Sequence, residues 1–325
     1  MAKYGSDSFG FLLIGGYNFI NSSLQGLSWK REAKTEMTHG LGATAELPTP
    51  VGVAKYTLAQ SGAFFDDTAA GAHALLAAGA TGVSRIVCFT VSGNTSGAPF
   101  VGCLGALTVA YEVLGQDNGI TKANAEYQIT GHAYDGQIIQ PLATKTADWD
   151  TDTLNTEVDY TSDTSQVVIP LTSNSAANPT VVTTTVAHGL TTGQVIMISG
   201  VVGSSADING ERTVTVTGLT TFTVPINATV SGGTGGSFVR CSTVAGCYSF
   251  LEVSACSGFT NFVATVRDSA DNVTYATLAT HTDNVTAPYA ETVTNGAETI
   301  NRYVTVQGNV TGTGSITCMV GLVRL

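Results

Sequence analysis

The chain has 325 residues, of which 43% are hydrophobic and only 11% are charged, whereas about 25% of residues are charged in a typical soluble domain. Its formal net charge of −11 argues against a protein that wraps nucleic acid, because such binding depends on clustered Lys and Arg. No apolar run reaches the roughly 20 residues of a membrane-spanning helix, and Met1–Asp7 lacks the order of a signal peptide, so we expect neither a membrane protein nor a secreted precursor.

The first 145 residues predict a β-rich module with one helix. Short apolar runs flank Gly15 and Gly16, which is typical of a hairpin. Turns rich in Gly and Asn separate the later runs. The predicted strands are Phe9–Ile14, Tyr17–Ile20, Val53–Gln60, Arg85–Val91, Phe100–Leu114 and Ala123–Ala133. We therefore expect an α+β sandwich or barrel.

Two local features stand out in this module. Ser28–Glu46 is its only charge-rich stretch and contains a Gly-Leu-Gly turn, so we expect an extended loop or arm. Asp66 and Asp67 precede the Ala/Leu-rich run Ala69–Ala78, which Gly79 follows. Acidic residues at a helix start interact favourably with the helix dipole, and Gly is common just past a helix end. We therefore predict one helix of about three turns, with Asp66 and Asp67 as its cap.

The composition changes near residue 146, which indicates separately built modules. All six lysines lie before this point, and residues 1–145 carry 8 basic and 10 acidic side chains. Residues 146–325 carry 5 basic and 14 acidic side chains. Because Thr144–Ser165 is rich in Thr and Asp and poor in aliphatic residues, we interpret residues 146–165 as a linker.

Beyond the linker, the sequence predicts an almost pure β structure. Short apolar runs separated by frequent turns between residues 178 and 238 indicate a small barrel, and longer alternating strands follow it. The predicted strands of this part are Val167–Leu171, Gln194–Ile198, Thr213–Val216, Phe222–Val224, Phe262–Arg267, Thr274–Thr280, Arg302–Val310 and Ser315–Val323. We interpret residues 166–177 plus 239–325 as a second β-sandwich domain, and residues 178–238 as a small β domain inserted into it.

Catalytic and metal-binding patterns are scarce in this sequence. It has no Gly-x-Ser-x-Gly elbow, no P-loop with Gly-Lys-Ser/Thr and no Cys-x-x-Cys. The histidines are scattered, and we interpret His188 and His281 as satisfied surface side chains. Among the six cysteines, Cys241 and Cys247 are close enough in sequence to suggest a local disulfide. We therefore expect no enzyme activity, no cofactor and no metal.

The scarcity of charge instead favours a structural protein. Few charged groups lose water when such surfaces pack together, which suits large and permanent interfaces. A β-rich chain also risks aggregation through open strand edges. We therefore expect these edges to be paired in a closed assembly of identical subunits.

Four stretches of the first module are distinctive: MAKYGSDSFGFLLIGGYNFI, THGLGATAEL, YTLAQSGAFFDD and KANAEYQITGHAYDGQ. They resemble the major tail (tail-tube) proteins of long-tailed bacteriophages. In the second half, VRDSADNVTYATLATHT and NRYVTVQGNVTGTGSITCMVGLVR are similar to the C-terminal portions of phage virion proteins. AHGLTTGQVIMISGV resembles a small β-module that recurs in such proteins. Together these stretches are distributed along the chain from residue 1 to residue 324.

The resemblance implies a β-sandwich with one helix, whose rings stack into a hollow tube that conducts the genome. It also implies that an extended loop reaches the neighbouring ring, and Trp29–Glu46 occupies the corresponding place here. The expected inter-subunit contact residues are Trp29, Lys30, Arg31, Glu32, Lys34, Glu36, His39, Leu41 and Glu46. A simple tube subunit is much shorter, so residues 166–325 are either a second tube-like domain or an outer decoration. The first alternative, a trimer with pseudo-sixfold symmetry, is favoured over a hexameric ring.

The expected partners are copies of this chain and the terminator, tape-measure and baseplate proteins of the tail. DNA would pass transiently through a lumen whose acidic charge repels phosphates. The expected location is the virion, after assembly in the cytoplasm of the host bacterium. Two other functions remain open at this point: a capsid-associated decoration or head-fibre protein, and a glycan- or receptor-binding module resting on residues 178–238.

Overall fold

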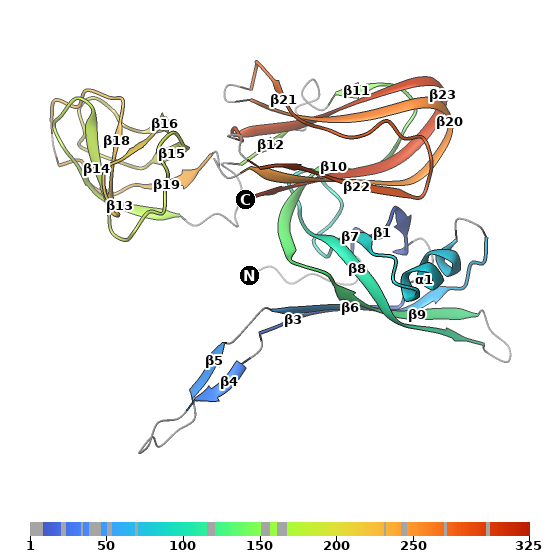
Figure 1. Ribbon diagram of the computed structural model, residues 1–325. Coiled ribbons are helices and arrows are strands. Elements are labelled where there is room, and N and C mark those ends of the chain that lie inside the picture. Colours follow the sequence, from blue (N-terminus) through green and yellow to red (C-terminus); the bar gives the residue numbers. More distant parts are fainter. Residues whose placement is uncertain are drawn as a thin grey trace.

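The computed structural model describes residues 9–20, 24–33, 35–38, 47–50, 54–68, 71–115, 121–150, 157–160, 168–230, 232–241, 246–269, 272–296 and 300–325. Within them the chain is mainly β with a single helix, which confirms the expected fold class. The strands form a 14-stranded sheet, a 7-stranded sheet and a two-stranded pair (Figure 1). No helix in this part of the chain is long and apolar enough to cross a membrane.

The N-terminal part of the large sheet is organised by its longest strand, β8. The other elements here are β1 (Phe11–Ile14), β2 (Tyr17–Asn18), β3 (Gly26–Glu32), β6 (Lys55–Phe64), α1 (Ala72–Ala80), β7 (Arg85–Thr90), β8 (Pro99–Leu114), β9 (Lys122–Ile129) and β10 (Ala133–Lys145). Up to Ala106, β8 pairs with β7 and β10, and from Ala106 onward it pairs with β9. The helix buries Leu75 and Leu76 in the hydrophobic cluster of this part.

The helix begins later than the sequence predicts, and Asp66 and Asp67 do not cap it. Gly71 occupies the N-cap position, where no side chain provides a capping hydrogen bond. The Asp66 carboxylate instead accepts hydrogen bonds from the backbone N–H of Thr68, at 3.1 Å, and from its hydroxyl, at 2.8 Å. These bonds lower the pKa of Asp66. Asp side chains favour such local turns as well as helix caps, so the sequence pattern does not distinguish the two, and the predicted cap at Asp66 and Asp67 was wrong.

The predicted strand Ala123–Ala133 covers nearly all of one strand, β9, and reaches the first residue of the next, β10. β9 ends at Ile129, β10 begins at Ala133, and Gly131 between them has φ +91°. The rest of β10 is not evident from the sequence pattern, because the strand buries Gln137 and Gln140. Buried glutamines remove the alternation of apolar and polar residues on which strand prediction depends.

Two very long strands, β20 (Cys247–Ser269) and β23 (Tyr303–Arg324), build the C-terminal sandwich. They pair along their length and bend at bulges near Phe259, opposite Gly312, whose φ is +101°. β22 (Tyr289–Asn295) pairs with the first part of β20, and β21 (Ala276–Thr280) pairs with its last part. The bend therefore turns one strand pair into two layers (Figure 1). The two predicted strands Arg302–Val310 and Ser315–Val323 are therefore the two parts of the single bent strand β23.

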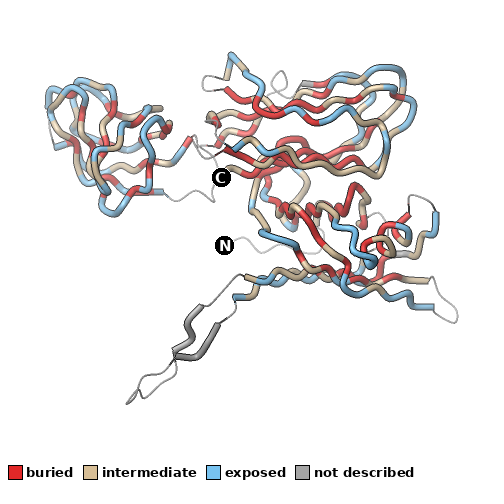
Figure 2. The backbone as a smooth tube through the Cα atoms, viewed as in Figure 1, coloured by how far each residue is buried: buried red, intermediate tan, exposed pale blue. Residues whose placement is uncertain are grey.

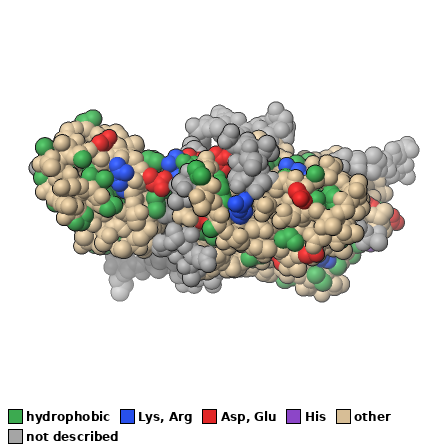
Figure 3. Space-filling view, turned by 90° about the horizontal axis from the view of Figure 1, so that it is seen from above, with side chains coloured by type: hydrophobic (Ala, Val, Ile, Leu, Met, Phe, Trp, Pro, Cys, Tyr) green, Lys and Arg blue, Asp and Glu red, His purple; other side chains and the backbone are tan. Residues whose placement is uncertain are grey.

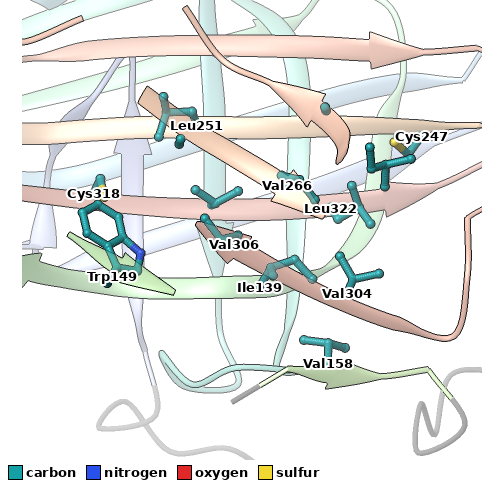
Figure 4. Close-up of a cluster of buried hydrophobic side chains, with 14 of the residues drawn as sticks. Ile139, Trp149, Val158, Cys247, Leu251, Val266, Val304, Val306, Cys318 and Leu322 are labelled. Carbon is teal, nitrogen blue, oxygen red and sulfur yellow. The ribbon is translucent and has the colours of Figure 1, made fainter. Parts of the chain in front are cut away.

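The core of this sandwich lies between the two layers, as the buried stretches in Figure 2 show. Leu251 and Leu322 come from the part of the strand pair before the bend, and Val266, Val304 and Val306 come from the part beyond it. All five side chains are fully buried in one cluster (Figure 4). Burial of apolar side chains from both layers stabilises the sandwich against opening.

Part of the predicted linker belongs to this sandwich. β11 (Trp149–Asp150) and β12 (Val158–Asp159) both pair with β23. Trp149 stacks on Phe262 with ring centroids 5.7 Å apart and, like Val158, is buried in the core. The acidic and Thr-rich composition hid these two anchors, because each strand is only two residues long.

The small sheet forms a separate body beside the sandwich (Figure 1). Its strand order is β16-β15-β19-β13-β14-β18-β17, and its own hydrophobic cluster is centred on Phe222 and Phe238. The first strand of the small sheet starts at residue 169. The segment 166–177, which we expected in the sandwich, therefore contributes to the small sheet instead. The strands are β13 (Ile169–Asn174), β14 (Thr180–Thr184), β15 (Val195–Ser199), β16 (Gly210–Thr213), β17 (Thr215–Val216), β18 (Thr221–Val224) and β19 (Ser237–Arg240).

The N-terminal part and the sandwich are joined by a shared sheet and a shared core. β10 pairs with β23, which makes the large sheet continuous across the joint. A buried cluster there combines Phe11 and Phe100 with Phe250 and Met319. Phe100 and Phe250 meet edge to face, with ring centroids 5.8 Å apart. The two halves of the chain are therefore one packed unit at this joint.

Candidate assembly surface

The charge-rich stretch predicted as an arm is a projecting β-ribbon. β3 pairs with β6, and the chain between them contains a second antiparallel pair, β4 (Thr35–Thr38) with β5 (Leu47–Pro50). Figure 1 shows this pair lying far from the rest of the molecule, at the end of an extension of β3 and β6. The expected extended loop or arm therefore lies where the charge pattern placed it, and its described part consists of paired strands.

The base of the arm is fixed to the body by aromatic and ionic contacts. Trp29 stacks on Tyr56 across the ribbon, with centroids 5.9 Å apart, and meets Phe89 edge to face at 5.2 Å. Arg31 donates two hydrogen bonds to the carboxylate of Asp135 on β10, of 3.0 Å and 2.6 Å. This pairing raises the pKa of Arg31. The Arg31 guanidinium also lies 5.7 Å from the Trp29 ring centroid, within cation–π range.

These contacts divide the predicted contact residues into two groups. Trp29 and Arg31 hold the arm in place, so their main role in the subunit is internal. Lys30 and Glu32 are exposed and form a 2.6 Å ion pair that lowers the pKa of Glu32. The structure describes the backbone of Glu36 on β4 but not its side chain. Lys34, His39, Leu41 and Glu46 lie outside the described residues.

Further features of the surface favour association. Within the described pairings β3 bonds only to β6, which leaves one edge of the ribbon open. The far part of β8 exposes Val109, Val113 and Leu114 by 57%, 43% and 38%. On the face seen in Figure 3, charged side chains are few and scattered among uncharged ones. Open edges and exposed apolar side chains are typical of surfaces that pair with another chain.

One buried chain of hydrogen bonds has the order of a hydrolase relay. Ser249 Oγ lies 2.8 Å from His281 Nε2, and His281 Nδ1 lies 3.2 Å from Glu291 Oε2. The bonds to His281 and its neighbour Thr282 lower the pKa of Glu291 to about 2. However, Ser249 is 0% and His281 is 1% exposed, so no substrate reaches the serine in this structure. The arrangement ties β20, β21 and β22 together.

The predictions for histidines and cysteines need correction. His281 and His188 are buried rather than at the surface, and His188 Nε2 lies 2.9 Å from the carbonyl oxygen of Gly218. Cys241 and Cys247 form no disulfide with each other. Burial raises the pKa of the Cys241 thiol to about 12. Among the described residues, no group of three or more His, Cys, Asp or Glu side chains is arranged to hold a metal ion.

Comparisons with known proteins add little to this description. No family model and no curated protein matches the chain. A solved structure described as "Virion of native gene transfer agent (GTA) particle" is 13% identical over 41% of this chain and 97% of that chain, with a TM-score of 0.31. A second, "Crystal Structure of SPP1 Dit (gp 19.1) Protein, a Paradigm of Hub Adsorption Apparatus in Gram-positive Infecting Phages", is 8% identical over 97% of this chain and 99% of that chain, with a TM-score of 0.28. Likenesses of this size carry no functional argument.

Proposed function

We propose that this chain is a structural subunit of a phage tail, and that its copies assemble into stacked rings that form the tail tube. The observation that carries the proposal is the arm, a β-ribbon that projects from the N-terminal part of the large sheet and ends in the β4–β5 pair. The tail-tube resemblance of the sequence supports the same assignment. As a tube subunit, the chain acts by packing and has no catalytic role.

The physics of an isolated ribbon supports an assembly role for the arm. A two-stranded ribbon is marginally stable in water, because it has no second layer to bury its side chains. Natural proteins rarely keep such a ribbon unless it packs on another surface. Trp29 and the Arg31–Asp135 pair fix its base, so the ribbon leaves the body in a defined direction. A neighbouring copy is the partner that supplies the missing surface.

The modules differ in the roles that they take in this proposal. The N-terminal part and the sandwich share a sheet and a core, so both belong to the wall of the tube. The small sheet has its own core and projects outward, where it does not interfere with stacking. The wall encloses a channel through which the genome passes, and the tube ends contact the other tail proteins. Rings of three chains with pseudo-sixfold symmetry agree with two wall units per chain.

Electron microscopy of the purified protein tests the proposal. We expect rings or tubes from the full chain. Replacing residues 33–53 by a two-residue turn should abolish tubes while leaving the sandwich folded by circular dichroism. Replacing residues 168–241 by a short flexible linker is the matched control, and this variant should still form tubes. Monomers or trimers from the full chain that bind phage heads would overturn the proposal and favour a capsid decoration protein.

A further inference from the structure

A cavity of about 350 Å³ lies where the helix meets the sandwich. Four parts of the chain enclose it: the turn between β1 and β2, the first turn of α1, the start of β7, and the loop before β22. Its lining residues are Gly15, Gly71, Ala74, Leu75, Arg85, Ala287 and Pro288. Arg85 is the charged side chain of this lining.

The Arg85 side chain lacks the partners that a half-buried cation normally has. Its Nε is buried and has no hydrogen-bond partner in the described part of the chain. The side chain is held against the β1–β2 turn, since a Cβ atom on Gly15 would lie only 3.2 Å from Arg85 Cδ. A guanidinium has five N–H donors, and burying a guanidinium without a counter-ion costs free energy. Arg85 therefore needs an acceptor from outside these residues.

The carboxylates described near the cavity are already engaged elsewhere. Asp66 lies beside Gly71, but its oxygens accept hydrogen bonds from Thr68 and, at 3.5 Å, from the Tyr17 hydroxyl. Glu252 lies on the other side of the β1–β2 turn and accepts a hydrogen bond from the Gly16 N–H. Neither forms an ion pair with Arg85. Arg85 thus lines the cavity with a charge that no described carboxylate pairs with.

We propose that this cavity binds a small oxyanion, a carboxylate or a phosphate, through the Arg85 guanidinium. The planar fork of an arginine matches both anions and holds them by paired hydrogen bonds. The first turn of α1 adds a weaker attraction, because the start of a nine-residue helix carries partial positive charge and Gly71 provides no side-chain cap. The cavity exceeds the size of either anion, so water fills the remainder.

The oxyanion has two possible sources with the same chemistry. It is either a free anion from solution or an acidic side chain of a neighbouring copy that enters the cavity. A free anion would bind the isolated subunit, whereas a neighbour's carboxylate would act only during assembly. The first source does not depend on the tube assignment, because phosphate binding can be measured on unassembled protein. The second source rests on the proposed self-assembly.

Thermal unfolding and calorimetry with inorganic phosphate test the first source. At tenfold excess over its Kd, phosphate should raise the Tm of the wild type by about 2 °C more than sodium chloride of equal ionic strength. Arg85→Gln should weaken phosphate binding at least about tenfold, while Arg85→Lys retains part of it. Ala74→Glu places a carboxylate at the cavity and should abolish the phosphate response. Ala74→Gln, of equal size and no charge, should keep it.

Assembly measurements test the second source. If a neighbour's carboxylate fills the cavity, phosphate alone does not change the Tm, and Arg85→Gln raises the concentration needed for assembly at least about tenfold. Ala74→Glu should then impair assembly and Ala74→Gln should not. The proposal is wrong if wild type and Arg85→Gln respond equally to phosphate and also assemble at the same concentration. Failure of the full chain to form tubes would contradict the proposed function but leave the phosphate result intact.

Discussion

At the scale of single residues, the most unusual group is the carboxyl of Glu252. It is 0% exposed at the joint between the N-terminal part and the sandwich, and its Oε2 accepts a 2.5 Å hydrogen bond from the Gly16 N–H. Among the residues that the structure describes, its Oε1 has no hydrogen-bond partner. Burial raises the pKa of Glu252 well above its usual value of 4.5, and the Gly16 and Cys88 hydrogen bonds only partly oppose this. The carboxyl at the joint is therefore harder to ionise in the folded protein than in the unfolded chain.

This raised pKa predicts a loss of stability as the pH rises. Above pH 4.5 the unfolded chain releases the proton of Glu252 while the folded chain keeps it. The free energy of unfolding therefore falls by up to about 1.4 kcal/mol per pH unit, until the pH passes the pKa of the folded carboxyl. Glu252→Gln keeps the acceptor for Gly16 and removes the titration. Urea unfolding at pH 5, 6, 7 and 8 should show the variant gaining stability relative to wild type as the pH rises above 4.5, until the pH passes the pKa of the folded carboxyl.

Glu291 provides the control for that measurement because its pKa is shifted the other way. Its pKa of about 2 means that Glu291→Gln should change the pH dependence only as the pH falls below about 4.5. Above that pH, both the folded and the unfolded chain hold the ionised carboxylate. A constant difference between wild type and Glu252→Gln from pH 5 to 8 would show that Glu252 does not titrate as described.

At the scale of elements, the bend in the β20–β23 pair determines the sandwich. A Cβ atom on Gly314 would lie 1.9 Å from the carbonyl oxygen of Ser257 and 2.8 Å from the backbone N of Phe259. Backbone atoms of a paired strand do not move aside at low cost. Gly314→Ala should therefore lower the free energy of unfolding by about 2 to 3 kcal/mol, measured by urea denaturation.

Gly296→Ala is the matched control for the bend. A Cβ atom there meets nothing within 4 Å, and the residue does not have a positive φ. Its effect should stay within about 0.5 kcal/mol of zero. Equal effects of the two substitutions would mean that the bend tolerates side chains and that another feature separates the layers.

The elements also show what a sequence reveals and what it does not. The hairpin at Gly15, the strands beside it and the charge-rich arm were predictable, because local periodicity and turn residues encode them. β10 was not, because its buried glutamines remove the alternation of apolar and polar residues. The two short strands of residues 146–165 were not, because they form by pairing with distant β23. The position of the arm followed from its charge. The role of Arg31 in fixing the base of the arm did not, because it depends on Asp135, which is 104 residues away. Arg85 and Glu252 likewise became notable only through tertiary burial.

At the scale of the whole molecule, the small sheet is joined to the body by an ionic contact. Arg302 of the sandwich donates hydrogen bonds to Asp159, at 2.9 Å and 2.8 Å, and reaches Glu211 of the small sheet at 3.3 Å. These contacts raise the pKa of Arg302, with Asp159 as the main cause. The pair with Asp159 holds the guanidinium in place, and Glu211 then attaches the small sheet to it.

Glu211→Gln should therefore free the small sheet without unfolding either body. Such partly exposed pairs contribute less than about 1 kcal/mol, so the Tm should change by no more than about 2 °C. Small-angle scattering should show a larger radius of gyration and a broader distance distribution for the variant, and high salt should have the same effect on the wild type. Glu32→Gln breaks an exposed ion pair on the arm and should leave the body's scattering profile unchanged. If Glu211→Gln and wild type give identical scattering in low salt, contacts other than Arg302 fix the orientation of the small sheet. In that case the connecting strands alone would have to account for an outward projection of the small sheet in the tube.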